Sequence, residues 1–347
     1  MTMHTDNTLN NDRRIAQWLL FCALAIFVMI ILGGVTRLTE SGLSIVEWKP
    51  VIGTLPPMNN LEWTREFEQY KQFPEYQKVN KGMSLDDFKT IFYFEYSHRL
   101  LGRLIGVIFL IPFLFFWFSK RIKPGLGIPL LGLFILGGLQ GALGWFMVKS
   151  GLVDNPRVSQ YRLAAHLGLA VIIYAYMLWL ALSLLQTRDR HPTVFSKRTL
   201  GLCAVIFFMI ITGAFVAGTR AGLAYPTWPL MGDSFIPANL YATTPFWLAA
   251  FEDITTIQFN HRILAYIITI IIAWLGFVLW RSNPSQQVKL AILLLCSALI
   301  MQVGLGIATL LNHVPVALAA SHQGVAIILL SSALFLAHSV KVGTRMH

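Results

Sequence analysis

The segment EYSHRLLGR (residues 95–103) begins a long apolar run that ends near Phe118. Placing a carboxylate, an imidazole and two guanidinium groups at the start of a membrane helix costs free energy, and ionisable groups found there usually serve a function. A second segment, QFNHRILAY (residues 258–266), begins another apolar run; it keeps the His-Arg pair but has Gln258 where the first has Glu95. The repetition predicts two related sites, and the lost carboxylate predicts that they differ in chemistry.

The composition places the chain among integral membrane proteins. Of its 347 residues, 56% are hydrophobic and 12% are charged, and the mean hydropathy is +0.62. Apolar runs of about 18 or more residues are typical of membrane-spanning helices. Eight such runs predict an all-α fold, near residues 15–36, 91–118, 126–148, 163–185, 199–219, 257–280, 288–311 and 316–338.

The basic residues predict the topology. If the N-terminus is cytoplasmic, the cytoplasmic pieces are residues 1–14, 119–125, 186–198, 281–289 and 339–347. They hold 13 basic and 3 acidic residues, which accounts for nearly all of the net charge of +11. This is the positive-inside pattern, so we expect both termini in the cytoplasm. The basic balance therefore indicates membrane topology and not nucleic-acid binding, for which the sequence has no motif.

The N-terminus carries no recognisable targeting segment. The first apolar run is too long for a signal-peptide core and lacks a small-residue cleavage site, so we expect it to remain as a helix. Asp6 and Asp12 argue against a mitochondrial presequence. The expected location is the bacterial inner membrane. Cys22, Cys203 and Cys296 each fall inside an apolar run and are interpreted as small buried hydrophobic residues.

The second half of the chain repeats the first. The end of the first apolar run, residues 33–43, aligns with residues 213–223 at a constant offset of 180, which also pairs Trp48 with Trp228. Further matches pair His98 with His261, Gln140 with Gln302, and His166 with His322. This order predicts an internal duplication of two tandem four-helix bundles, residues 15–185 and 199–338, joined by the linker 186–198. An even number of helices per half predicts a pseudo-two-fold axis along the membrane normal.

A long outer loop, residues 38–90, follows the first helix. Trp63, Phe67 and Tyr70 fall on one face of a predicted short helix, which we expect to lie on the membrane surface. Ser84, followed by Asp86 and Asp87, is typical of a helix start, and that helix is expected to continue into the second membrane span.

Four histidines form the candidate metal site. His98 and His166 belong to the first half and His261 and His322 to the second, all near the outer ends of inward-running helices. Two histidines facing each other across a helical bundle are typical of haem ligation in membrane cytochromes. Zinc or copper is the alternative metal, although no Cys ligand or HExxH motif supports it. A hydrogen-bonded contact between helices is the alternative for any single histidine.

Five arginines lie at the outer boundary near these histidines. Guanidinium groups suit the carboxylates of haem propionates. The alternative for each arginine is that its side chain extends to the water at the membrane interface and binds no ligand. The five are Arg37, Arg99, Arg162, Arg220 and Arg262.

Glu95 distinguishes the first site from the second. It lies three residues before His98, so both share one helix face, whereas the second half has Gln258 at the matching position. An electron-transfer haem needs no acid or base beside it, but a site that moves protons or stabilises a developing cation does. We therefore interpret the first half as the reacting site and the second as a resident electron-transfer site. The alternative is that Glu95 pairs with Arg99 or Arg103 and only stabilises the helix start.

Seven motifs together resemble the haem A synthase family, and the first outer loop, with residues 63–76 and 83–88, is similar to its proteobacterial and mitochondrial branch. The motifs span nearly the whole chain in order: GGVTRLTESGLS (33–44), ExxHRxxGR (95–103), QGxxGW (140–145), AH (165–166), GTRAG (218–222), NHR (260–262) and SHQ (321–323). Some members carry a cysteine pair in the first outer loop, and this loop has none.

The resemblance implies an enzyme that oxidises the C8 methyl of haem O to a formyl group through a hydroxymethyl intermediate, for cytochrome oxidase. It implies that His261 and His322 hold haem b, and that His98, His166 and Glu95 form the substrate site. Expected partners are the lipid bilayer, an unidentified electron carrier, the haem O-making enzyme and a second copy of the chain. The rival functions are a non-catalytic dihaem cytochrome and a transporter built on a parallel repeat.

Overall fold

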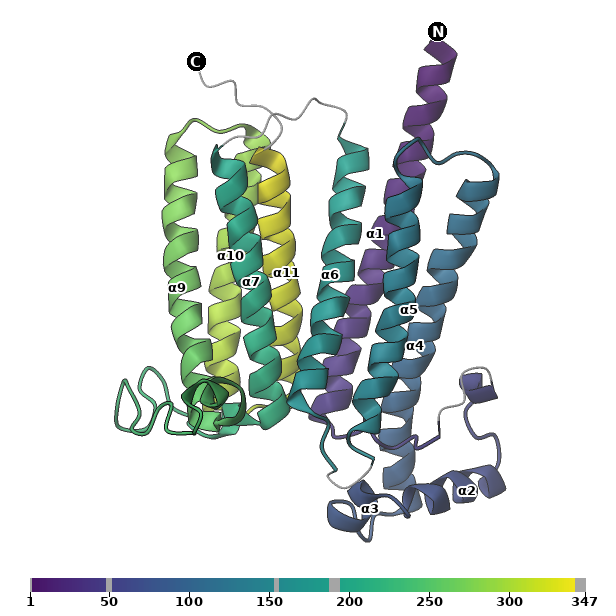
Figure 1. Ribbon diagram of the computed structural model, residues 1–347, viewed down its shortest axis with the longest axis vertical. Coiled ribbons are helices and arrows are strands. Elements are labelled where there is room, and N and C mark those ends of the chain that lie inside the picture. Colours follow the sequence, from purple (N-terminus) through teal and green to yellow (C-terminus); the bar gives the residue numbers. More distant parts are fainter. Residues whose placement is uncertain (1, 48–51, 153–155, 187–193, 341–347) are drawn as a thin grey trace. The chain divides into compact units, whose positions relative to one another are not determined.

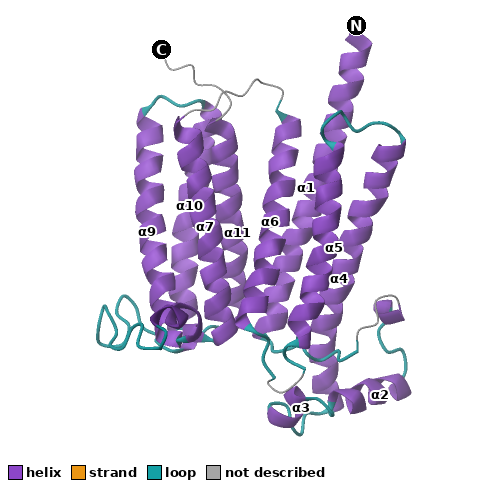
Figure 2. Cartoon of the chain, viewed as in Figure 1, coloured by secondary structure: helices purple, strands orange, loops and turns teal. Residues whose placement is uncertain are grey.

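The computed structural model describes residues 2–47, 52–152, 156–186 and 194–340, and every helix in these ranges is shown in Figure 2. Apart from a single β-bridge, the regular structure of these residues is helical. The elements are α1 (Thr2–Leu38), η1 (Ile52–Thr54), α2 (Asn60–Tyr70), α3 (Pro74–Lys78), α4 (Leu85–Phe118), α5 (Gly127–Lys149), α6 (Gln160–Leu185), α7 (Val194–Thr219), η2 (Ala221–Leu223), η3 (Phe246–Leu248), α8 (Ala249–Glu252), α9 (Ile254–Arg281), α10 (Gln286–Leu311) and α11 (Val316–Val340).

Eight of these helices, α1, α4–α7 and α9–α11, are long and apolar enough to cross a membrane. The predicted all-α membrane fold is therefore confirmed, and most predicted spans agree with the helices to within a few residues. The exceptions are α1, which begins at Thr2, and α4, which begins at Leu85. The early start of α4 confirms the predicted cap: the Asp87 backbone N–H donates to the Ser84 hydroxyl (3.2 Å), and the Ser84 backbone N–H donates to the Asp87 carboxylate (3.4 Å).

The chain divides into two compact units. One comprises residues 24–170 and is called the central unit; the other comprises residues 1–23 and 171–347 and is called the terminal unit. The division falls inside α1 and α6, which each contribute one part to each unit. Most of the predicted linker, residues 187–193, lies outside the described residues. The assignment of one functional site to each half of the chain stays a prediction.

The terminal unit contains a ring of four helices, seen as the green, teal and yellow helices of Figure 1. α7 packs against α9 and α11, and α10 packs against the same two helices. The C-terminal part of α6 joins them through a 2.8 Å hydrogen bond between the hydroxyl groups of Tyr174 and Ser331. A helical bundle of this kind offers an interior in which side chains from facing helices can meet.

The ends of α1 and α7 repeat each other in detail. Thr39 and Thr219 each donate a side-chain hydrogen bond to the carbonyl four residues earlier, at 2.9 and 2.7 Å. The next residues, Glu40 and Arg220, both adopt a left-handed backbone, with φ of 54° and 58°. Both pairs obey the offset of 180 found in the sequence, so the duplication extends to backbone conformation. Trp48, part of the same alignment, lies outside the described residues.

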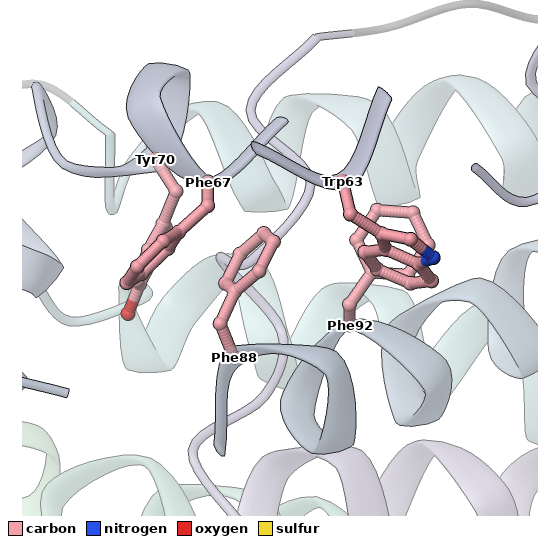
Figure 3. Packing of buried hydrophobic residues seen from close by; sticks show 5 residues of the cluster. All are labelled: Trp63, Phe67, Tyr70, Phe88 and Phe92. Carbon is pink, nitrogen blue, oxygen red and sulfur yellow. The ribbon is translucent and has the colours of Figure 1, made fainter. Parts of the chain in front are cut away.

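The first outer loop of the central unit packs an aromatic cluster against the start of α4 (Figure 3). The apolar face of α2 contributes Trp63, Phe67 and Tyr70, and α4 contributes Phe88 and Phe92. The Phe88 ring stacks on Phe67 and Tyr70, with centroids 5.0 and 5.1 Å apart. These side chains are buried against protein, so the apolar face of α2 packs on α4; the position of the helix on the membrane surface stays a prediction.

A carboxyl group lies buried beside this cluster. Glu75 on α3 is 5% exposed, and the Tyr70 hydroxyl donates to its Oε2 over 3.1 Å. The Asn80 amide donates to the same hydroxyl at 2.7 Å. Burial disfavours the charged carboxylate and raises the pKa of Glu75 from its ordinary value of 4.5 to about 8.

The outer loop should therefore lose stability as the pH rises from 4.5 towards 8. Over this window the folded loop holds a proton on Glu75 that the unfolded loop releases, so unfolding becomes more favourable with increasing pH. Glu75→Gln, which is neutral at every pH, should flatten this dependence. Hydrogen–deuterium exchange of residues 60–80 at pH 5.5 and 8.5, corrected for intrinsic rates, measures it.

Glu68→Gln is the matched control for this measurement, because Glu68 lies on the exposed face of α2 and pairs only with Lys71 at 2.7 Å. It should keep the pH dependence of the original protein. Identical pH profiles for Glu75→Gln and the original protein would contradict the assignment.

Candidate functional site

The four candidate histidines form two pairs, one in each unit. In the central unit His98 lies on α4 and His166 on α6, and the two rings are close enough to interact electrostatically. In the terminal unit His261 on α9 and His322 on α11 interact in the same way. The structure thus brings together the residues that the sequence paired within each half.

Every one of these histidines packs against a glycine on a neighbouring membrane helix. A Cβ placed on the glycine would lie within 2.9–3.4 Å of the Cε1 atom of the ring. The four pairs, with that distance, are Gly33 and His98 (2.9 Å), Gly144 and His166 (2.9 Å), Gly213 and His261 (3.4 Å), and Gly306 and His322 (2.9 Å). Each imidazole therefore lies directly on a helix backbone. The sequence contained this signal, because Gly33 and Gly213 also obey the offset of 180.

In each unit a glutamine contacts one histidine, and the two glutamines occupy matching positions of the internal repeat. The Gln140 side-chain amide nitrogen lies 3.1 Å from Nδ1 of His166. The Gln302 amide nitrogen lies 3.4 Å from Nε2 of His322. The sequence paired these two glutamines as landmarks of the repeat, and the structure places both beside the candidate metal-binding rings.

Glu95 is buried and surrounded by hydrogen-bond donors. Its Oε2 accepts hydrogen bonds from the Ser44 hydroxyl and the Ile45 backbone N–H, both at 2.8 Å. Its Oε1 accepts from Nε and Nη2 of Arg99, at 3.0 and 2.6 Å. The side chain is 3% exposed. The ion pair with Arg99 that the sequence left open is therefore present, and the loop after α1 contributes two further donors.

In the terminal unit an amide and an arginine also link an outer loop to the helix that carries a histidine, but no negative charge takes part. We call such a link an arginine brace. The Gln258 amide donates to the Tyr225 carbonyl at 3.2 Å, and Arg262 donates to the same carbonyl at 2.8 Å. Arg99 likewise donates to the Ile45 carbonyl at 2.7 Å, and Ile45 aligns with Tyr225 at the offset of 180. Both units thus tie an outer loop to the helix that carries a histidine.

Ser44 is a site residue that the sequence reasoning missed. Its hydroxyl is buried and donates to Glu95, whereas the residue aligned with it at the offset of 180 is Ala224, which has no hydroxyl. The difference between the two halves therefore involves two residues that touch each other. The alignment already contained the signal for Ser44.

The candidate arginines mostly brace the outer ends of helices. Arg162 donates to the Phe146 carbonyl at 2.7 Å, and its guanidinium lies 3.7 Å from the centroid of the Phe146 ring. Arg99 and Arg262 donate to loop carbonyls, as described above. Arg37 lies in the last turn of α1, and Arg220 follows α7 in a left-handed conformation. Arg37, Arg162 and Arg220 thus lie at or next to a helix end, whereas Arg99 and Arg262 directly follow His98 and His261 inside their helices.

The donor set fits haem better than zinc. Two imidazoles per unit match the two axial positions that a porphyrin leaves open on iron, whereas a zinc site uses three or four protein ligands. Within the described ranges no group of three or more His, Cys, Asp or Glu residues could hold a metal ion. In the terminal unit, both histidine Nδ1 atoms also lie at hydrogen-bond distance from an oxygen: 2.8 Å from the Thr212 hydroxyl for His261 and 3.1 Å from the Gln302 carbonyl for His322. Ligating histidines usually make such a bond.

Gly33→Ala should lower the melting temperature of the protein in detergent, whereas Gly213→Ala should not. Alanine favours a helix over glycine by about 1 kcal/mol. At Gly33 this gain is outweighed, because the new Cβ would lie 2.9 Å from His98 and overpacking costs about 1–3 kcal/mol. At Gly213 the new Cβ would meet His261 at 3.4 Å, an ordinary contact distance. Equal effects of the two substitutions on the melting temperature would contradict this view of the histidine contacts.

The chain matches known proteins over almost its full length. A family model described as Cytochrome oxidase assembly protein (COX15-CtaA) matches residues 16–334. A protein of Nitrosospira multiformis named Heme A synthase is 50% identical over 345 residues, covering 97% of this chain and 96% of the relative. Proteins of the same name from Nitrosomonas eutropha and Parvibaculum lavamentivorans are 48% and 49% identical, covering 95% and 94% of each chain. The chain therefore belongs to the cytochrome oxidase assembly protein family whose model it matches.

Proposed function

We propose that this protein is a haem A synthase, a membrane oxidoreductase that converts the C8 methyl of haem O to a formyl group through a hydroxymethyl intermediate. The observation that carries the proposal is the match, over nearly the whole chain, to relatives named Heme A synthase that are 50% and 48% identical in sequence. The two histidine pairs on four membrane helices support it, because the reaction needs a site for a substrate haem and a route for the electrons removed from the methyl group.

The terminal unit is proposed to hold the resident cofactor. His261 and His322 would ligate a haem b, which when bound supplies one-electron transfer. The uncharged Gln258 at this site supports the assignment, because electron transfer requires no acid or base beside the haem. Arg262 directly follows His261 and Arg220 follows α7, and their guanidinium groups suit the propionates.

The central unit is proposed to bind the substrate. His98 and His166 would hold haem O, with Arg37, Arg99 and Arg162 near its propionates. Glu95 lies one helical turn from His98 and is held by four donated hydrogen bonds, so its carboxylate has a fixed position. A fixed negative charge can stabilise positive charge that develops on the substrate carbon as electrons leave, or it can accept the proton that is released.

The proposal includes the cellular setting. The positive-inside pattern supports a multi-pass protein of the bacterial inner membrane with both termini in the cytoplasm. The haem O-making enzyme would supply the substrate, and electrons would leave to an electron carrier. A homo-oligomer is part of the same proposal.

The alternative function is a dihaem b-type cytochrome that only transfers electrons. Two histidine pairs would suit it equally. The Glu95–Ser44 pair favours the enzyme, because it adds a buried charge to one site and leaves the other neutral. Extraction of the haems from purified protein, with and without co-expressed haem O supply, separates the two functions by mass. Haem b together with haem O, haem A or a hydroxylated intermediate is expected; two haem b per chain under both conditions would support the cytochrome.

Glu95→Gln should lower the conversion of haem O to haem A at least about 100-fold, a typical loss when one charge-stabilising group is removed. The protein should still fold and bind haem b, because Gln258 shows that an amide can occupy the matching position. The measurement is the rate of formyl haem formation by purified protein, alongside haem b content.

Glu62→Gln is the control for this variant. Glu62 is an exposed residue of the same outer loop, and its carboxylate accepts hydrogen bonds from the Met58 backbone N–H at 2.7 Å and the Asn59 amide at 2.8 Å. It should convert haem O normally. Full activity of Glu95→Gln would remove the carboxylate from the mechanism.

A further inference from the structure

The hydroxyl of Thr212 fixes which nitrogen of His261 carries the proton. Thr212 Oγ1 lies 2.8 Å from the His261 Nδ1 and 2.8 Å from the Met209 carbonyl oxygen. The Thr212 hydroxyl donates its single hydrogen to the Met209 carbonyl. In that arrangement the hydroxyl oxygen accepts from Nδ1–H, so His261 carries its proton on Nδ1 and the lone pair of Nε2 is available to a metal.

A backbone carbonyl determines which nitrogen of His322 carries the proton. Its Nδ1 lies 3.1 Å from the Gln302 carbonyl oxygen, which can only accept, so Nδ1 carries the proton. The Gln302 amide nitrogen, a donor, lies 3.4 Å from Nε2, as expected for a lone pair on that atom. Both histidines of the terminal unit thus present Nε2 as the ligating atom.

The central unit lacks both arrangements. Leu32 precedes Gly33 as Thr212 precedes Gly213, and both glycines lie against a histidine, so Leu32 occupies the register of Thr212. Leu32 offers no side-chain acceptor. The buried Nδ1 of His98 accordingly has no hydrogen-bond partner among the described residues.

The second histidine of the central unit faces a donor and not an acceptor. The Gln140 amide nitrogen donates to the His166 carbonyl at 3.0 Å, which fixes the orientation of the amide. The same nitrogen lies 3.1 Å from the His166 Nδ1, so that atom is an acceptor and the proton is on Nε2. Binding iron through Nε2 would require the proton and the amide to rearrange.

We infer that these Nδ1 partners decide which site keeps its haem and which exchanges it, with Thr212 and Leu32 as the residues that set the difference. The inference rests on the proposed function. An oxygen acceptor on Nδ1 orients a ligating imidazole and makes it a stronger electron donor, and its loss typically weakens metal affinity 10–100-fold. A resident cofactor needs that affinity. A substrate site must release its product, and tight axial ligation would oppose release.

Thr212→Val tests the terminal unit, since it removes the hydroxyl and keeps the shape. Haem b should transfer to apomyoglobin about 10- to 100-fold faster than from the original protein. The reduction potential of haem b should also rise, because a weaker donor stabilises ferric iron less. Thr212→Ser, which keeps the hydroxyl, should restore both values. Thr269→Val is the matched control, because the Thr269 hydroxyl donates within its own helix, to the Ala265 carbonyl at 2.8 Å.

Leu32→Thr tests the central unit independently of any folding defect in Thr212→Val. A hydroxyl at this register should give the His98 Nδ1 an acceptor. The haem bound in the central unit should then dissociate about 10- to 100-fold more slowly, measured by transfer to apomyoglobin, and product should accumulate on the enzyme.

Unchanged haem b transfer and potential in Thr212→Val, or unchanged dissociation in Leu32→Thr, would overturn the inference. Either result leaves the proposed function standing if the original protein converts haem O to haem A. Failure of the original protein to make formyl haem, while it still binds haem at both sites, would instead overturn the proposed function.

Discussion

The packing of an imidazole against the backbone of a neighbouring membrane helix is the constraint on which the rest of this structure depends. A ring on one helix can lie against the next only where that helix offers no Cβ, and each of the four histidines meets a glycine at this point. The close approach brings the backbone within reach of the ring, as at the Gln302 carbonyl. Polar atoms inside a membrane protein are costly without a hydrogen-bond partner, so every neighbouring hydroxyl, amide or carbonyl has a large effect on the ring nitrogens. The small residues and the polar residues near the helix ends are parts of one arrangement.

Comparison of the two repeat halves shows which site residues both units share and which residues differ between them. The histidines, the glycines, the glutamines and the arginine brace occur in both halves. Two contacts do not: Ser44 with Glu95 in the central unit, and Thr212 with His261 in the terminal unit. Their counterparts are residues that cannot make the same bond. The first contact holds a carboxylate near a histidine, and the second places a hydroxyl against one. In the proposed function, these two contacts distinguish the reacting site from the resident cofactor site.

The outer loop shows where a periodic pattern is ambiguous. Trp63, Phe67 and Tyr70 share a helix face, which fits a membrane surface as well as a protein surface. In the structure this face contacts protein, because α4 begins at Leu85 and its first turns place Phe88 against the α2 side chains. The Ser84 cap and the continuation of this helix into the membrane span were predicted from the sequence, but the partner that its first turns contact was not.

The sequence by itself determined the eight membrane helices, because the length and apolarity of a span are local properties that the bilayer imposes. It also determined the repeat, and through the repeat it singled out the four histidines and the difference at Glu95. Only the tertiary structure decided which atoms meet: that Ser44 donates to Glu95, that the Thr212 hydroxyl contacts His261, and that each ring lies on a glycine. Such contacts depend on how far each helix is rotated and shifted against its neighbour. Hydrophobic periodicity fixes which face of a helix is buried but not that rotation to within a hydrogen-bond length, because the final fit is set by side-chain packing between helices.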